Sequence, residues 1–128
     1  MKLKYKLIKR ANPQDRTKAK WYAAPVNAGK INRKDLDKGI ANMSSLSRGD
    51  VSNAIENLLD IMPKYLLMGK SVNLGEFGTL RLSFSSKGID QAENFNVQMI
   101  NNAKVIFTPS PEFRRTLKEI AFEKEEEK

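Results

Sequence analysis

The segment from Val72 to Leu82 constrains the fold of this chain more than any other. Apolar residues alternate with polar ones along it: Val72, Leu74, Leu80 and Leu82. Period-two alternation is what a half-buried β-strand requires. Gly75 and Gly78 stand inside the pattern on either side of Phe77, and glycine within a strand indicates a tight bend or a close backbone approach. The segment therefore predicts a β-hairpin.

Two helices are predicted before this hairpin. Asn32 can cap the first, which has Asp35 at its third position and an apolar face at helical spacing: Leu36, Ile40 and Met43. Ser47 opens the second, which ends at Gly69 as a left-handed cap. Pro63 should kink it. Its apolar stripe is wider than one short helix can cover, which indicates a partner surface.

The chain begins and ends with further predicted elements. Residues 2–7 alternate lysine with apolar side chains, and a turn at residues 12–15 leads to a second short strand at residues 21–26, so the two strands could form an antiparallel unit. Phe95, Val97 and Met99 fit a strand that returns from the hairpin, and residues 104–107 are another strand fragment. Ser110 caps a last helix, with Pro111 at its first position.

Basic residues are concentrated at the N-terminus. Residues 1–34 carry eleven Lys and Arg against one acid, whereas the remaining residues carry twelve basic and fourteen acidic side chains. Such a block favours a polyanion such as nucleic acid, although a solubilising lysine-rich surface is the alternative. Trp21 and Tyr22 lie among these lysines and could stack on bases, but packing against the body is the more common role of such aromatics. The acidic run at residues 123–128 is predicted to be a solvated tail.

The composition excludes several functions. The chain has no Cys and no His, which excludes thiolate nucleophiles, His-based triads and the usual zinc sites. It also lacks a phosphate-binding glycine loop, so we expect no enzyme activity, no metal, no cofactor and no small-molecule substrate. No apolar run approaches the ~18 residues needed to cross a bilayer, and no signal peptide is recognisable, which predicts a cytoplasmic protein without a membrane partner.

Two motifs resemble the bacterial HU/IHF-type histone-like DNA-binding proteins. Residues 69–74 running into 77–80 are similar to the family segment G-x-x-V-x-L-x-x-F-G-T-F, and residues 107–109 are similar to its F-x-P entry to the last helix. The resemblance covers about Leu36 to Ile120, and the lysine-rich extension is similar to that of a longer HU-related branch. It implies an α+β, IHF-like fold: a helical body with a β-sheet saddle and β-arm, built as an intertwined homodimer. A short N-terminal β extension would precede it, giving a basic extension at 1–34, an HU/IHF-like domain at 35–122 and a charged tail at 123–128.

The basic block and the resemblance each provide candidate residues. The basic block provides the DNA-binding candidates of the extension: Lys2, Lys4, Lys6, Lys9, Arg10, Lys18 and Lys20. The resemblance implies further candidates on the saddle, arm and last helix: Arg81, Lys87, Lys104, Arg114, Arg115 and Lys118. The dimer core would contain Leu58, Met62, Leu66, Phe77 and Phe107. The arm lacks the family's Arg-Asn-Pro tip and carries Asp90 and Glu93, so most nonspecific affinity is expected from the extension. The proline of the family's tip acts as an apolar wedge between base pairs, and Ile89 or Phe95 could replace it here or simply pack the arm.

The leading expectation is an architectural, nucleoid-associated protein that binds duplex DNA as a homodimer with little sequence specificity, through phosphate and minor-groove contacts. One alternative is an HU-like dimeric protein-interaction module with reduced or lost DNA binding. Another is an RNA-binding module that uses Trp21 and Tyr22 as stacking platforms.

Overall fold

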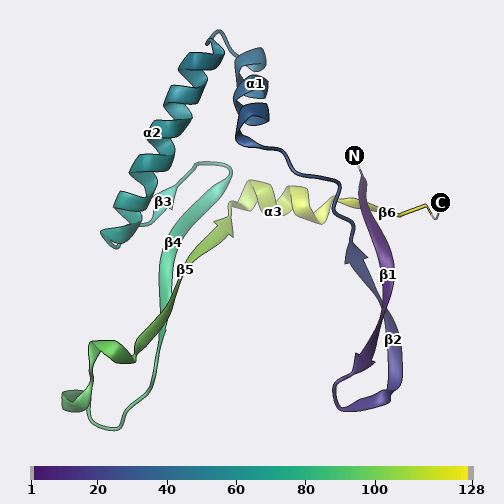
Figure 1. The fold of residues 1–128 in the computed structure, drawn as a ribbon, viewed down its shortest axis with the longest axis vertical. Coiled ribbons are helices and arrows are strands. Elements are labelled where there is room, and N and C mark those ends of the chain that lie inside the picture. The colour runs from purple at the N-terminus through teal and green to yellow at the C-terminus, as the bar shows by residue number, and fades with distance from the viewer. Residues whose placement is uncertain (1, 127–128) are drawn as a thin grey trace. The chain divides into compact units, whose positions relative to one another are not determined.

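The computed structural model describes residues 2–126 and has α+β architecture, with three α-helices and two small sheets in that range (Figure 1). The chain divides into two units. One combines the residues up to Ile31 with those from Arg115 onward, and the other is Asn32–Arg114. Each unit is described by itself below.

The first unit contains a three-stranded sheet in the order β2-β1-β6. Strands β1 (Lys2–Asn12) and β2 (Asp15–Pro25) form an antiparallel hairpin, and β6 (Ala121–Lys124) pairs with β1 in parallel. Side-chain hydrogen bonds hold the turn, because Asn12 Oδ1 accepts from the Gln14 backbone N–H at 2.9 Å. The predicted antiparallel unit is therefore confirmed.

Two details of this sheet differ from the sequence expectation. Strand β2 begins at Asp15 rather than at Trp21, because the polar residues between them face solvent on a strand whose backbone hydrogen bonds are made with β1. Residues 121–124 were expected at the end of the last helix and the start of a solvated tail. They form β6 instead. Its side chains are all exposed, so the sequence carries no apolar alternation that would indicate a strand, and the strand is held by backbone pairing with β1.

Two helices form the helical part of the second unit: α1 (Arg33–Met43) and α2 (Arg48–Leu67). Both predicted caps are present, since Asn32 accepts from the Asp35 N–H at 2.9 Å and the Ser47 Oγ accepts from the Asp50 N–H at 3.1 Å. Helix α2 continues through Pro63 and is followed by Gly69, whose φ of +81° matches the predicted left-handed cap.

Arg33 joins the two helices. Its Nε donates to Asp37 at 3.1 Å, its Nη1 donates to Glu56 at 2.9 Å and its Nη2 donates to the Ser52 carbonyl at 2.9 Å. These contacts, with Glu56 first and Asp37 second, raise the pKa of Arg33 above its ordinary value. A fully charged guanidinium thereby fixes α1 against α2.

The second unit also contains a sheet in the order β3-β4-β5, formed by β3 (Val72–Asn73), β4 (Gly78–Ser86) and β5 (Ile100–Pro109). The hairpin predicted for residues 72–82 is confirmed, since β3 and β4 pair antiparallel with Val72 opposite Leu80. Gly75 has φ +64° and makes the bend. Gly78 has φ +153°, and a Cβ there would collide with the Thr108 carbonyl oxygen and lie 2.6 Å from the Phe107 ring, so its position requires a close backbone approach.

The far end of the β4–β5 ribbon differs from the prediction. The returning strand expected through Phe95, Val97 and Met99 is absent, and these residues lie in and around two short 3₁₀ turns, η1 (Ala92–Asn94) and η2 (Val97–Met99). The Asn96 side chain accepts from the Gln98 N–H at 2.9 Å and so stabilises η2. This side-chain bond competes with strand pairing, and β5 begins only at Ile100.

The last helix, α3 (Pro111–Lys118), starts where it was predicted. The buried Ser110 hydroxyl accepts from the Phe113 N–H at 3.1 Å and donates to the Glu76 carbonyl, and the Ser110 N–H donates to the Phe77 carbonyl at 3.1 Å. The Phe77 ring lies 4.8 Å from the Phe107 ring and 5.5 Å from the Phe113 ring, between centroids. Ser110 and this aromatic cluster fix the start of α3 to the root of the β4–β5 ribbon.

Candidate nucleic-acid interface

Strand register places six basic side chains on one surface of the β2-β1-β6 sheet. Side chains alternate between the two faces of a strand, and register partners share a face. Lys6 lies opposite Ala24 and Arg10 lies opposite Lys20, which fixes the shared side. We call this surface the cationic face and define it by six basic residues: Lys2, Lys4, Lys6, Arg10, Lys18 and Lys20. Arg16 continues the same alternation on β2, but it lies beside the register irregularity at Ala11 and Asn12 and is left out of the set.

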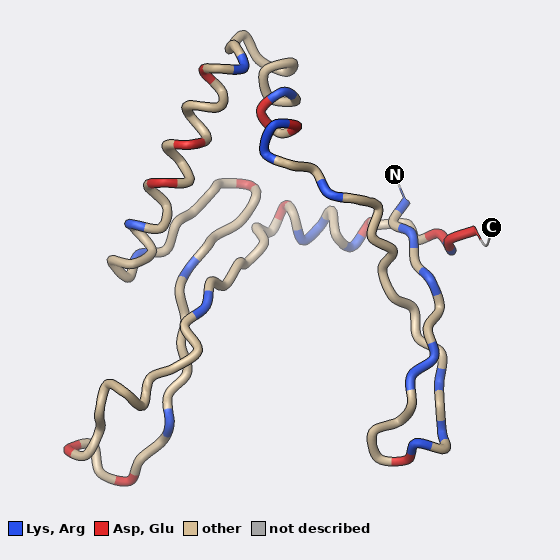
Figure 2. Tube along the Cα trace, viewed as in Figure 1, with Lys and Arg blue, Asp and Glu red and all other residues tan. Residues whose placement is uncertain are grey.

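The cationic face is exposed and largely uncompensated. All six basic side chains are exposed, and within residues 2–126 none of them forms an ion pair with an acid. Glu123, the register partner of Lys4, is the acid that β6 adds to this side of the sheet. Figure 2 shows the resulting concentration of Lys and Arg along both strands of the β1–β2 hairpin. Such a surface attracts a polyanion and releases its counterions.

The opposite surface of the same sheet is mainly apolar. Its members include Leu3, Tyr5, Leu7, Trp21, Pro25 and Phe122. Lys9 belongs to this side, because it is the register partner of Trp21, and its Nζ lies 5.9 Å from the indole ring centroid. The sheet thus separates Lys9 from the six residues of the cationic face. The interruption of the lysine alternation by Ile8 is the sequence signal for this separation.

The β4–β5 ribbon brings together two of the three candidates predicted on it. Ser83 is the register partner of Lys104, and Arg81 is two residues from Ser83 on the same strand, so Arg81 and Lys104 share a face. Lys87 lies beyond the end of β4, where its N–H donates to the Met99 carbonyl at 3.1 Å. Past Lys87, the charged residues of the tip are Asp90 and Glu93, both exposed, and Figure 2 shows the acidic tip. The tip is therefore unfavourable for phosphate.

The three basic candidates in α3 lie on adjoining parts of the helix surface. Lys118 is four residues from Arg114 and three from Arg115, so it neighbours both of them. Arg115 makes further contacts within the structure. Arg115 and Lys118 also occupy the last turn of α3, where positive charge is favourable next to the helix C-terminus.

The residues predicted for a dimer core are incompletely covered in the single chain. Leu66 is buried and Met62 is half-buried, but Leu58 is 41% exposed and Phe77 is 52% exposed. Phe107 is 38% exposed. Among residues 2–126, Val51 and Leu66 are the only large apolar side chains that are buried. The single chain therefore leaves large apolar side chains of the predicted dimer core, such as Leu58 and Phe77, open to a partner surface.

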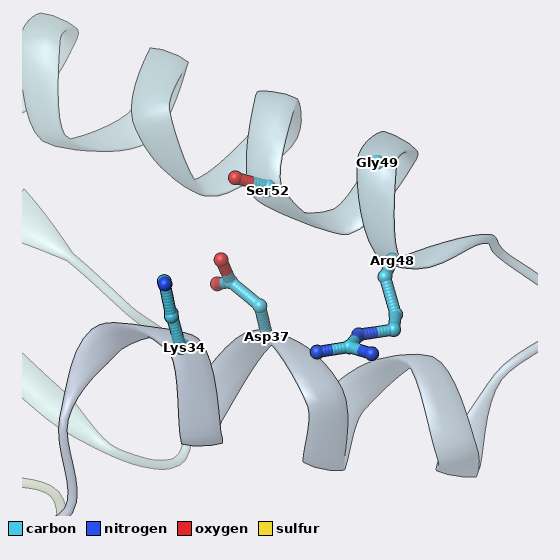
Figure 3. Close-up of a pocket in the computed structure, with 5 residues that line it drawn as sticks. All are labelled: Lys34, Asp37, Arg48, Gly49 and Ser52. Atoms are coloured by element: carbon cyan, nitrogen blue, oxygen red, sulfur yellow. The ribbon is translucent and has the colours of Figure 1, made fainter.

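A hollow of about 300 Å³ lies between α1 and α2 (Figure 3). Its lining residues are Lys34, Asp37, Arg48, Gly49 and Ser52. The Asp37 carboxylate points into the space and is paired with Arg33. A carboxylate at the centre opposes an anionic ligand, so the hollow belongs to the α1–α2 junction rather than to a phosphate site.

The described part of the chain contains neither a membrane-spanning helix nor a cluster of metal ligands. No helix between residues 2 and 126 has the length and apolar character needed to span a bilayer. The same residues contain no group of three or more Asp or Glu side chains placed to hold a metal ion.

Comparisons with known proteins agree with this architecture. No curated protein matches the chain. Among solved structures, a "Putative bacterial DNA binding protein" from Bacteroides vulgatus superimposes with a TM-score of 0.65 at 17% identity. The match covers 98% of this chain but 49% of that one, so this chain spans about half the length of its structural relative. Residues 1–124 match the family HU-HIG, described as an HU domain fused to wHTH, Ig, or Glycine-rich motif, and the chain therefore belongs to the HU-HIG family.

Proposed function

We propose that this protein binds duplex DNA as a homodimer with little sequence specificity and acts as an architectural protein of the bacterial nucleoid, in the cytoplasm and without catalytic activity. The observation that carries the proposal is the cationic face, where six basic side chains lie on one side of one sheet without an ion pair in the described residues. Lysine and arginine side chains of this kind contact phosphates, and such contacts contribute affinity without sequence specificity.

The HU family and the structural relative support the choice of DNA as the polyanion. The chain belongs to an HU-domain family, and the Bacteroides vulgatus structure of similar fold carries the description quoted above. Arg81 and Lys104 on one face of the β4–β5 ribbon, Lys87 beyond it, and Arg114, Arg115 and Lys118 on α3 would add phosphate contacts.

Homodimer formation is supported by the uncovered apolar surface of the second unit. Leu58 on α2 and the rings of Phe77 and Phe107 are between 38% and 52% exposed in a single chain. An isologous interface presents the same patch twice and would cover these residues on both protomers. A single chain buries two large apolar side chains in the described range, and the interface would enlarge this core.

The salt dependence of duplex binding tests the proposal with a matched pair of variants. Lys6→Gln removes a charge from the cationic face, and Lys9→Gln removes the same charge from the opposite face of the same strand. Each phosphate contact contributes about 0.9 to the slope of log K against log salt on B-DNA, and a homodimer carries two copies of each residue. Lys6→Gln should therefore reduce the slope by about 1.8 for each bound dimer, and Lys9→Gln should leave it unchanged. The triple variant Lys4→Gln/Lys6→Gln/Lys20→Gln should reduce it by about 5.4.

Two results would contradict the proposal. Equal effects of the Lys6 and Lys9 variants would mean that net charge, and not the cationic face, governs binding. Failure of the unmodified protein to bind duplex DNA at low salt would favour the second candidate, an HU-like dimeric module for protein interaction. The observation in favour of that candidate is the β-arm tip, where the charged residues beyond Lys87 are Asp90 and Glu93.

A further inference from the structure

An aromatic side chain lies in the middle of the cationic face. Tyr22 is the register partner of Ile8, and Ile8 lies between Lys6 and Arg10 on the same side of β1. Tyr22 is 47% exposed, whereas Ile8 beside it is half-buried. The Tyr22 side chain therefore lies beside an aliphatic neighbour and remains open to solvent.

Basic side chains surround this ring on three sides. Lys6 and Arg10 are its diagonal neighbours across the hairpin, at a Cα separation of roughly 7–8 Å for such positions. Lys20 stands two residues before it on the same face of β2. An exposed aromatic ring bordered by charges that hold a phosphate backbone is the arrangement by which sheets bind single-stranded nucleic acid.

The neighbouring aromatic residue is on the other side of the sheet. Trp21 is the register partner of Lys9, and the Lys9 ammonium lies 5.9 Å from the indole centroid. The sequence presents Trp21 and Tyr22 as equivalent stacking candidates, but the strand separates them. Tyr22 alone of the two shares a surface with the six residues of the cationic face.

We propose that the cationic face also binds single-stranded nucleic acid, with the Tyr22 ring stacked on an unpaired base while Lys6, Arg10 and Lys20 contact the adjoining phosphates. The inference rests on the proposed function because it uses the same charges. It differs in one respect: in a duplex the faces of the bases are stacked on one another, so the ring can reach them only in a single strand. Tyr22 should therefore contribute to single-strand affinity and not to duplex affinity.

The test compares oligo(dT), oligo(U) and a mixed-sequence duplex of equal length, each titrated against the full chain at one fixed low salt concentration. Tyr22→Leu keeps an apolar side chain on the strand but removes the ring, and it should lower single-strand affinity by about 5- to 150-fold, the range for one stacked base. Tyr22→Phe keeps the ring and should bind as the unmodified protein does. Trp21→Leu, the matched change on the opposite face, should leave affinity unchanged.

The outcomes separate this inference from the proposed function. A loss with Tyr22→Leu on either oligo(dT) or oligo(U), with duplex affinity retained and Phe restoring binding, supports it, and the polymer that shows the loss identifies DNA or RNA as the strand. Unchanged single-strand affinity, or an equal loss on the duplex, overturns it, even if duplex binding through Lys6 is intact. Strong quenching of Trp21 fluorescence by oligo(dT) that survives Tyr22→Leu would also overturn it, since Trp21 is the single tryptophan of the chain and would then be the platform.

Discussion

Leu58 offers a direct test of the proposed homodimer, because it lies on α2 and is 41% exposed in one chain. Complete burial of a leucine side chain contributes about 1.5–3 kcal/mol, so covering the remaining two-fifths would contribute about 0.6–1.2 kcal/mol in each protomer. A two-fold interface buries both copies. The transfer term lost in Leu58→Ala is thus about 1.2–2.4 kcal/mol, and the dimer dissociation constant should rise about 7- to 50-fold.

Sedimentation equilibrium over a range of protein concentrations measures this constant. If the unmodified dimer is too tight to dissociate, urea unfolding at two concentrations replaces it, because the midpoint of a dimer depends on protomer concentration. Met43→Ala is the control: Met43 is 90% exposed at the end of α1 and is not among the expected dimer-core residues, so its loss should not change dissociation. A protein that is monomeric at every concentration, or a Leu58 variant as tight as the Met43 variant, would refute the reasoning.

Two further predictions concern local bonds. Ser110→Ala removes the cap of α3 and the hydroxyl that bonds the Glu76 carbonyl, so urea unfolding should show a loss of about 2–4 kcal/mol, with Ser110→Thr restoring most of it. The pKa of Asp15 is lowered from 3.8 because its carboxylate accepts from the Thr17 hydroxyl at 2.6 Å and from the Thr17 N–H at 3.1 Å. This stabilisation is therefore present at neutral pH and is lost as the pH falls through the lowered value. The Tm difference between the unmodified protein and Asp15→Asn should decrease as the pH falls below 3.8 and disappear below the lowered pKa of Asp15; a difference that does not decrease over this range would contradict it.

Local chemistry explains what could be predicted from the sequence. The helix starts at Asn32, Ser47 and Ser110 depend on side chains that bond backbone groups three residues away, and these signals are contained in a few neighbouring residues. The bend of the hairpin at residues 72–82 also has a local cause, since Gly75 and Gly78 both adopt a positive φ. Elements with short-range causes were placed correctly.

The errors arose where distant pairing or competing local bonds decide the structure. Strand β6 exists because of a partner more than a hundred positions away, and its own composition is that of a solvated tail. Phe95, Val97 and Met99 alternate as a strand does, but 3₁₀ turns form there instead. The Asn96 side chain accepts a hydrogen bond from the Gln98 N–H, which is then not available for strand pairing. In the site, alternation alone could not separate Lys9 from Lys6, or Trp21 from Tyr22, until the β1–β2 register was known.

The parallel pairing of β6 with β1 has a consequence for the order of folding. The β1–β2 hairpin closes over a turn of a few residues, whereas Lys2 meets Ala121 across about 120 residues of chain. A two-stranded hairpin is marginally stable alone, and closing a long loop is slow. During synthesis the β1–β2 hairpin therefore lacks its third strand, β6, until the whole second unit has been made, and its lysines stay exposed to solvent until then. The surface that we propose for nucleic acid should be the last part of the described chain to become rigid.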